Sequence, residues 1–146
     1  MKNQTRILLV EDNPGDARLI EEVIKENKVK CEMHLVSDGE AAIEYLKKAG
    51  NHINEQTPDL IILDLNLPKK DGFEVLDFIK TDDSLKFIPV VILTVSQSSD
   101  DILKSYNKRA NCFITKPSDF GDLIKVIEKL KHFWMKSVEL PKSVYY

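Results

Sequence analysis

Long apolar runs, closely spaced cysteines and a large net charge are all absent from this sequence. Its longest apolar runs, such as residues 60–63 and 90–93, are far shorter than the roughly 20 residues that span a bilayer. Its two cysteines, Cys31 and Cys112, lie far apart without metal-ligand spacing, which indicates buried thiols in a reducing cytoplasm rather than a disulfide. The net charge of −3 gives no electrostatic reason to expect nucleic acid or a membrane surface as a partner.

Targeting signals and internal divisions are also missing. Residues 1–6 lack the apolar segment and cleavage site of a secretory signal peptide, so we expect a cytoplasmic protein. No repeat, low-complexity segment or break in composition divides the 146 residues, which are enough for one domain with a sizeable core. We therefore treat the chain as one globular domain.

Short apolar runs alternate with segments of helical periodicity along the chain. Residues 60–63 are apolar throughout, which is typical of a strand covered on both faces, whereas Phe73, Leu76 and Ile79 recur at helical spacing. Apolar runs predict five strands, at residues 6–10, 33–36, 60–63, 90–93 and 112–115. A helix-periodic segment follows each run, and this alternation predicts an α/β fold with a doubly wound, five-stranded parallel sheet.

Chemically capable side chains lie at the ends of four predicted strands. Glu11 and Asp12 follow the first strand and Asp64 follows the third, while Thr94 ends the fourth and Lys116 follows the fifth. Ligands of a doubly wound sheet bind beyond the carboxyl ends of its strands, so we expect these side chains to lie together.

This set favours a hard cation and phosphoryl chemistry. Three carboxylates held close together raise one another's pKa values, and a divalent cation removes that conflict. Because the set contains oxygen ligands and no His or Cys, Mg²⁺ is favoured over Zn²⁺. A carboxylate beside such an ion can act as a nucleophile and become an aspartyl phosphate, with Lys116 and Thr94 contacting the phosphoryl oxygens.

Each of these residues alone has a structural explanation. Glu11 and Asp12 could be helix N-terminal acids and Asp64 a turn former. Thr94 is a common strand residue, and Lys116 could be a solvated loop lysine. Their shared place at the strand ends favours the functional interpretation.

Four segments carry a resemblance to a known family. They are residues 7–13 (Ile-Leu-Leu-Val-Glu-Asp-Asn), residues 59–68 (Asp-Leu-Ile-Ile-Leu-Asp-Leu-Asn-Leu-Pro) with Asp71-Gly72, residues 89–94 (Pro-Val-Val-Ile-Leu-Thr) and residues 115–117 (Thr-Lys-Pro). Through them the sequence resembles the CheY-like receiver domain of two-component response regulators over residues 5–133. The resemblance implies a flavodoxin-like fold with strand order 2-1-3-4-5. It leaves residues 134–146 as a C-terminal tail that we expect at a dimer contact.

The resemblance also implies a phosphoacceptor and a metal site. Asp64 is expected to accept a phosphoryl group from a sensor histidine kinase. Asp12, Asp64 and the backbone carbonyl of Asn66 are expected to coordinate Mg²⁺, with Glu11 reaching the ion through water. The protein would then be a regulator that promotes its own phosphorylation and dephosphorylation, and not an enzyme acting on other substrates.

A switch is implied in the same way. Thr94 and Lys116 would contact the phosphoryl group, and Phe113 would rotate inward when Thr94 moves. The Lys116–Pro117 bond would be cis, a form that is rare and usually retained for a reason. Residues 95–100 would form the bistable loop beside this pair.

The expected output surface comprises residues 98–106, Phe113 and the final helix.

Two residues depart from the family pattern, one beside the expected site and one in the expected switch. Val95 stands where receivers usually carry a smaller residue or Thr, and a branched side chain there would restrict access to the site. Phe113 lacks the hydroxyl of the commoner Tyr, so a switch reported by that hydroxyl is excluded.

A narrower resemblance is to the phytochrome-associated response regulators. It is carried by residues 11–16 (Glu-Asp-Asn-Pro-Gly-Asp), residues 64–68, residues 110–112, an extended loop at residues 49–58, and Phe133-Trp134 with Leu140-Pro141. It implies a kinase partner with a bilin photoreceptor, and a homodimer through the fourth helix, fifth strand and fifth helix with the C-terminal extension. Aromatic residues such as Phe133 and Trp134 more often pack in a core, but their place at the end of the final helix favours half-exposed side chains that form part of a partner surface.

Three alternatives remain open. An aspartyl-phosphate phosphohydrolase would want a second acid two residues after the nucleophile, where this chain has Asn66. An unphosphorylated pseudo-receiver would lack one of the acids, the Thr or the Lys. A phosphorelay intermediate that passes the group to a histidine phosphotransferase shares the chemistry and differs only in its partner. No DNA-binding segment follows the receiver, so direct transcriptional control is not expected.

Overall fold

The computed structural model describes residues 4–26, 30–51 and 57–141. The elements in chain order are β1 (Thr5–Val10), α1 (Pro14–Lys25), β2 (Cys31–Val36), α2 (Gly39–Asn51), β3 (Leu60–Leu63), α3 (Gly72–Thr81), β4 (Val90–Thr94), α4 (Ser99–Asn107), β5 (Cys112–Thr115), α5 (Phe120–His132) and the π-helix η2 (Phe133–Ser137). Of the extended loop expected at residues 49–58, residues 52–56 lie outside the described residues, and residues 49–51 belong to α2. No helix within the described ranges is both long and apolar enough to cross a membrane.

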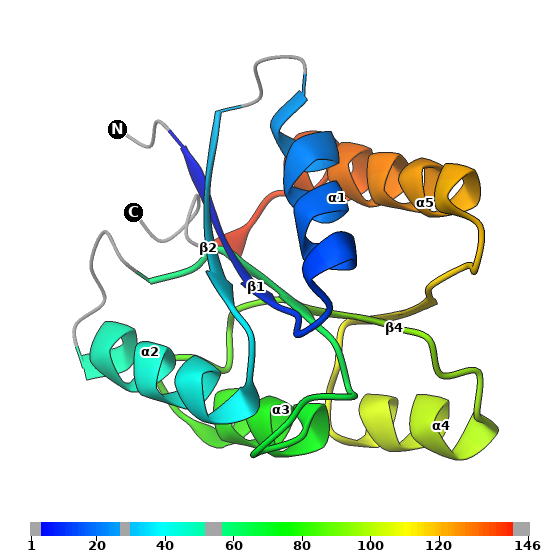
Figure 1. The fold of residues 1–146 in the computed structure, drawn as a ribbon. Coiled ribbons are helices and arrows are strands. Elements are labelled where there is room, and N and C mark those ends of the chain that lie inside the picture. Colours follow the sequence, from blue (N-terminus) through cyan, green and yellow to red (C-terminus); the bar gives the residue numbers. More distant parts are fainter. Residues whose placement is uncertain (1–3, 27–29, 52–56, 142–146) are drawn as a thin grey trace.

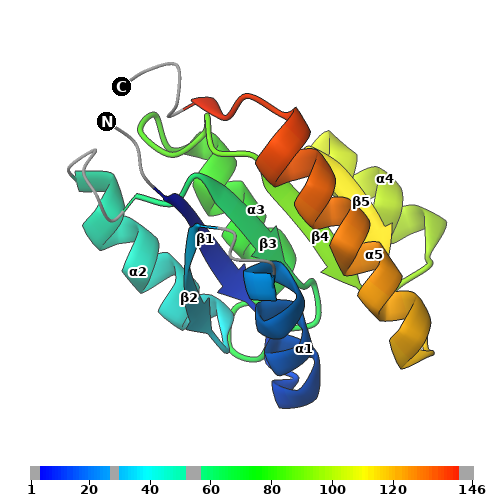
Figure 2. The ribbon, with the colours of Figure 1, turned by 90° about the horizontal axis from the view of Figure 1, so that it is seen from above.

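The strands form one parallel sheet in the order β2-β1-β3-β4-β5. This order confirms the fold that the resemblance implied. Figures 1 and 2 show α1 and α5 side by side on one face, with α2, α3 and α4 on the other. Because every strand runs the same way, the carboxyl ends of β1, β3, β4 and β5 meet at one edge of the sheet.

The sheet is buried between two apolar clusters. Along β1, Ile7 and Leu9 join the cluster under α1 and α5, whereas Leu8 and Val10 join the cluster under α2 and α3. All residues of Leu60–Leu63 (β3) are buried because alternate side chains enter opposite clusters. This is why β3 reads as a continuous apolar run and not as an alternating one.

Polar caps begin four of the helices at the carboxyl edge of the sheet. The side chains of Asn13, Asp71, Ser98 and Asp119 accept hydrogen bonds from backbone N–H groups in the first turns of α1, α3, α4 and α5. Caps of this kind stabilise a helix by about 1 kcal/mol each. They fix where each helix starts, and hence the loops between strand ends and helices that carry the candidate site.

The C-terminal segment continues the core. Helix α5 runs directly into the π-helix Phe133–Ser137, so the expected boundary after residue 133 falls inside a continuous helix. Trp134 is only 9% exposed and packs with Leu140 into the cluster under α1 and α5, whereas Phe133 is 54% exposed. The expectation of a half-exposed aromatic is therefore wrong for Trp134, because Trp134 extends the apolar face of α5 that carries Leu130.

Candidate functional site

The carboxylates predicted at the strand ends lie together. Glu11 and Asp12 follow β1, Asp64 follows β3, and one oxygen from each of the three lies within 4.8 Å of the others. Glu11 and Asp64 are buried, while Asp12 is exposed. The donors are all carboxylate oxygens, so the group fits a hard divalent cation.

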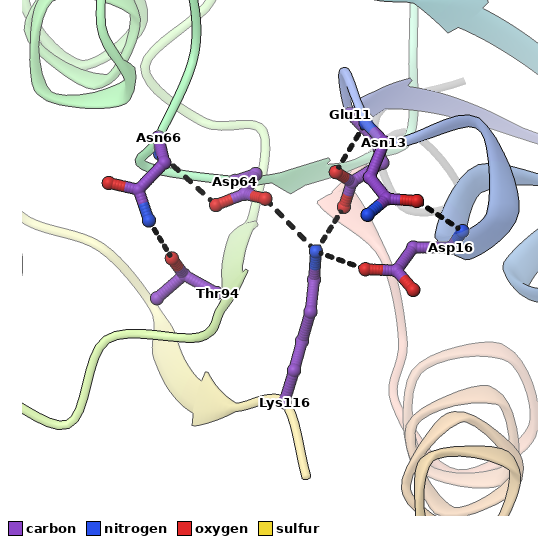
Figure 3. A network of polar contacts seen from close by, with 7 residues as sticks. All are labelled: Glu11, Asn13, Asp16, Asp64, Asn66, Thr94 and Lys116. Atoms are coloured by element: carbon purple, nitrogen blue, oxygen red, sulfur yellow. Dashed lines mark hydrogen bonds and ion pairs between the residues drawn. The ribbon is translucent and has the colours of Figure 1, made fainter. Parts of the chain in front are cut away.

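Lys116 reaches into this group from the end of β5. Its Nζ lies 2.6 Å from Glu11 Oε1, 2.9 Å from Asp16 Oδ2 and 3.0 Å from Asp64 Oδ2 (Figure 3). The Lys116 side chain is only 3% exposed. The ammonium is therefore shared by three carboxylates, two that directly follow β1 and β3 and one in the first turn of α1.

Burial and charge shift the pKa values of this network in defined directions. Burial raises the pKa of Glu11 to about 7, although the hydrogen bond from Lys116 opposes the rise, and the charge of Asp64 adds to it. Burial acts to lower the pKa of Lys116. The hydrogen bonds to Glu11 and Asp16 and the charge of Asp64 outweigh burial, so the pKa of Lys116 lies above its ordinary value. Lys116 therefore remains an ammonium at neutral pH.

Asn66 and Thr94 lie on the other side of Asp64. The backbone N–H of Asn66 donates to Asp64 Oδ1 at 3.1 Å, and Asn66 Nδ2 donates to Thr94 Oγ1 at 3.5 Å. Thr94 is fully buried at the end of β4. The Asp64 carboxylate is thus held from both sides, with Lys116 on Oδ2 and Asn66 on Oδ1 (Figure 3).

Gly72 allows the loop after Asp64 to close against α3. A side chain at this first residue of α3 would collide with the carbonyl oxygen of Asp64 and the Cα of Leu65. The backbone N–H of Gly72 also donates to the Leu65 carbonyl at 3.0 Å. The Asp71-Gly72 pair therefore sets the position of the phosphoacceptor candidate as well as capping α3.

Asp16 is the residue of this network that sequence reasoning missed as a site residue. In the sequence it stands out only as part of the segment at residues 11–16. The available signal was its place in the first turn of a helix that begins directly after Glu11 and Asp12. That turn starts at the carboxyl edge of the sheet, so an acid on it can face the strand ends.

The expected switch residues lie at β5 and the loop after β4. Phe113 is half-buried against the cluster under α2 and α3, and its backbone N–H donates to the Tyr106 hydroxyl at 3.1 Å. Thr115 Oγ1 donates to the carbonyl of Ser96 at 3.0 Å, which ties β5 to that loop. Val95 is 60% exposed, so its side chain lies at the surface of the loop.

The expectation of a cis Lys116–Pro117 bond is wrong. Among the described residues, every peptide bond is trans. The trans form is favoured intrinsically by about 0.5–1 kcal/mol before Pro. Lys116 Nζ reaches Glu11, Asp16 and Asp64 with the bond in this form.

Comparisons with known proteins identify the family. The response regulator receiver domain matches residues 7–128. The chain is 47% identical over 137 residues to the response regulator Rcp1 of Synechocystis, an alignment that covers 94% of this chain and 93% of Rcp1. The crystal structure of the phosphorylated cyanobacterial phytochrome response regulator RcpA superposes with a TM-score of 0.89 at 46% identity, covering 95% of this chain and 99% of RcpA. The Mn²⁺-bound form of Rcp1 gives a TM-score of 0.88 at 46% identity, covering 94% and 99%.

These matches agree with the strand order and with the acids and lysine gathered at the carboxyl edge of the sheet. Phosphorylation of an aspartate is the general mechanism of this family. The chain belongs to the response regulator receiver family of two-component signalling.

Proposed function

We propose that Asp64 is the residue that accepts a phosphoryl group from a sensor histidine kinase, and that the modification switches a protein-binding surface. The observation that carries the proposal is the placement of Asp64. Its carboxylate contacts the Lys116 ammonium at 3.0 Å and lies with Glu11 and Asp12 at the end of β3. Glu11 shares these neighbours at the end of β1, but Asp64 also accepts the backbone N–H of Asn66 at 3.1 Å, and the Asn66 side chain contacts Thr94.

The transfer requires one bond to form and one to break. A carboxylate oxygen of Asp64 bonds to phosphorus while the bond from phosphorus to the histidine nitrogen of the kinase breaks. Lys116 offsets the negative charge of the phosphoryl oxygens, and the Thr94 hydroxyl donates to one of them. The Asn66 N–H on Asp64 Oδ1 orients the carboxylate during the attack.

The cofactor of this reaction is Mg²⁺ in our proposal. Asp12, Asp64 and the backbone carbonyl of Asn66 would hold it, with Glu11 acting through water. Such an ion would offset the negative charge of the phosphoryl group during its transfer. Support comes from the oxygen-only donor set of Glu11, Asp12 and Asp64, and from the Mn²⁺-bound structure of the relative Rcp1.

A replacement of the acceptor tests this assignment. The wild type, incubated with Mg²⁺ and acetyl phosphate or a phytochrome-type histidine kinase, should gain one phosphoryl group by intact mass. Asp64→Asn should gain none, because an amide cannot form the acyl phosphate. Asp83→Asn, a change at a fully exposed side chain, is the matched control and should behave like the wild type. Uptake by the Asp64 variant would refute the assignment.

The switched surface in this proposal is the face of α4, β5 and α5, which also forms a homodimer. Five large apolar side chains are exposed on or beside these elements: Val95, Leu103, Tyr106, Phe120 and Phe133. Apolar side chains in such a group favour a protein partner. A phytochrome-type kinase is the proposed donor because the relative RcpA is a phytochrome response regulator.

Sedimentation of the wild type and of Leu103→Asp tests the dimer. Leu103 is 63% exposed, so a charge there should not unfold the monomer. The proposal expects the wild type to sediment as a dimer in at least one of its two states, phosphorylated or unphosphorylated. The Leu103→Asp variant should be shifted toward the monomer in that state. A monomeric wild type in both states, or an unchanged variant, would count against this face.

A further inference from the structure

Asp16 differs from the other two carboxylates that contact Lys116. Glu11 and Asp64 belong to the group of acids whose oxygens lie close enough to hold a metal ion, and Asp16 does not. Asp16 is also the only one of the three that lies on a helix, in the first turn of α1. Its contact with Lys116 therefore needs a separate explanation.

Local geometry turns the Asp16 side chain away from its usual partner. A carboxylate at the third position of a helix commonly reaches back to the backbone N–H of the capping residue. In this chain the N–H of Asn13 donates to Glu11 Oε2 at 3.1 Å, while Asn13 Oδ1 accepts the Asp16 N–H at 3.0 Å. The Asp16 carboxylate points instead at Lys116 Nζ, 2.9 Å away (Figure 3).

The ammonium of Lys116 has three N–H donors and, in this structure, three carboxylate partners. Two of those partners have another task in the proposed reaction, because Glu11 and Asp64 also serve the ion and Asp64 becomes part of the acyl phosphate. Asp16 is not one of the acids grouped for the ion, so its contact with Lys116 does not compete with that task.

We propose that Asp16 is a positioning residue, which anchors the Lys116 ammonium above Asp64 while Glu11 and Asp64 are engaged with the ion and the phosphoryl group. The inference rests on the function proposed for Asp64 and Lys116. With one N–H bound to Asp16, the remaining donors of Lys116 are aimed at Asp64 and at the phosphoryl oxygens. Without that anchor, a flexible lysine side chain must be ordered in each transfer event.

A second lysine provides a control for general loosening of α1. Lys131 of α5 is buried and donates to the carbonyl oxygens of Val23 and Glu26 at the other end of α1, at 3.0 and 2.7 Å. Lys131→Met removes these two hydrogen bonds between α5 and the end of α1, keeps the apolar packing of the two helices, and removes no contact of Lys116. Asp16→Asn removes the negative charge beside the Lys116 ammonium and keeps the size of the side chain.

The experiment compares the full chain as wild type, Asp16→Asn, Asp16→Glu and Lys131→Met. The measured quantities are the maximal rate of Asp64 phosphorylation at saturating acetyl phosphate and Mg²⁺, the half-saturating acetyl phosphate concentration, and the ¹⁵N signal of the Lys116 ammonium. We expect Asp16→Asn to lower the maximal rate roughly tenfold and to change half-saturation less than about twofold, because orientation and not binding is lost. The Lys116 ammonium signal should be broadened by faster exchange with water.

Asp16→Glu should recover at least about a third of the wild-type rate, because it restores the charge. Lys131→Met should stay within about twofold of the wild type. A wild-type rate in Asp16→Asn, or an equal loss in Lys131→Met, would overturn the role of Asp16 and leave the function of Asp64 intact. A wild type that takes up no phosphoryl group would instead overturn the proposed function, and the role of Asp16 with it.

Discussion

Lys116 and Lys80 are both buried lysines, but they lie at opposite edges of the same sheet. Lys116 follows β5 at the carboxyl edge, where its ammonium meets three carboxylates. Lys80 lies near the end of α3 at the amino edge. Its ammonium donates to the carbonyl oxygens of Lys86 and Ile88, at 3.2 and 2.8 Å, and to Asn111 Oδ1 at 3.0 Å. Burial lowers the pKa of Lys80 to about 8, whereas the carboxylates raise that of Lys116.

The partners decide what each lysine can do. At the carboxyl edge the carboxylates outnumber the one ammonium, so a bound cation would offset the excess negative charge. Such a cation and Lys116 can then both act in phosphoryl transfer. At the amino edge, neutral acceptors hold Lys80 in place, and in return Lys80 ties the loop before β4 to α3. Asn111 Oδ1 also accepts the N–H of Val90, so the same contact aligns the start of β4. The comparison predicts that activity depends on one edge and folding stability on the other.

The largest effect should come from replacing the lysine at the carboxyl edge. Lys116→Met is expected to lower the rate of Asp64 phosphorylation roughly a thousandfold, equivalent to about 4 kcal/mol of barrier, because a charged donor to the phosphoryl group is lost. The measurement is incorporation of label from acetyl phosphate with Mg²⁺. Lys80→Met makes the same chemical change at the amino edge and should leave that rate within about twofold of wild type. A similar loss in both variants would remove the distinction between the edges.

Stability should also respond to the helix that follows β5, where two neighbouring aromatics differ in burial. Trp134→Ala is expected to lower the free energy of unfolding by about 3 kcal/mol, because a large side chain leaves the cluster under α1 and α5. Phe133→Ala, at a side chain that is 54% exposed, should change it by less than about 0.5 kcal/mol. Urea unfolding followed by far-ultraviolet circular dichroism measures both. Equal effects would contradict the placement of Trp134 in the core.

The carboxyl edge could be predicted from sequence because parallel strands bring their carboxyl ends together. Glu11, Asp64, Thr94 and Lys116 each lie within one or two residues of a strand end, so their proximity needs only the strand boundaries. Asp16 escaped this reasoning because its proximity depends on where the first turn of α1 lies over the sheet, which the strand boundaries alone do not give.

Other features needed information that periodicity lacks. Alternating strands and helices indicate a parallel sheet, but the neighbour order β2-β1-β3-β4-β5 came from the resemblance alone. Trp134 follows Leu130 at helical spacing, which is consistent with its burial, but no local signal marks the change from α-helix to π-helix at residue 133. The cis form expected at Pro117 was transferred from the family and is contradicted by this chain's backbone.

The smallest predicted effect is a pH dependence that separates Lys80 from the other lysines. In the unfolded chain the pKa of Lys80 returns to about 10.5 from about 8 in the folded protein. Between these values Lys80 holds a proton in the unfolded chain that it has released in the folded protein. The contribution of Lys80 to the free energy of unfolding therefore rises with pH. Well below pH 8 Lys80 is protonated in both states, and its contribution is constant. From pH 8 to about 9.5 the wild type should gain about 1.5 kcal/mol that Lys80→Met does not. The measurement is urea unfolding of both proteins across this range. Parallel pH profiles would mean that Lys80 keeps its ordinary pKa in the folded protein. The neutral acceptors around Lys80 would then stabilise an ammonium as effectively as the carboxylates stabilise that of Lys116.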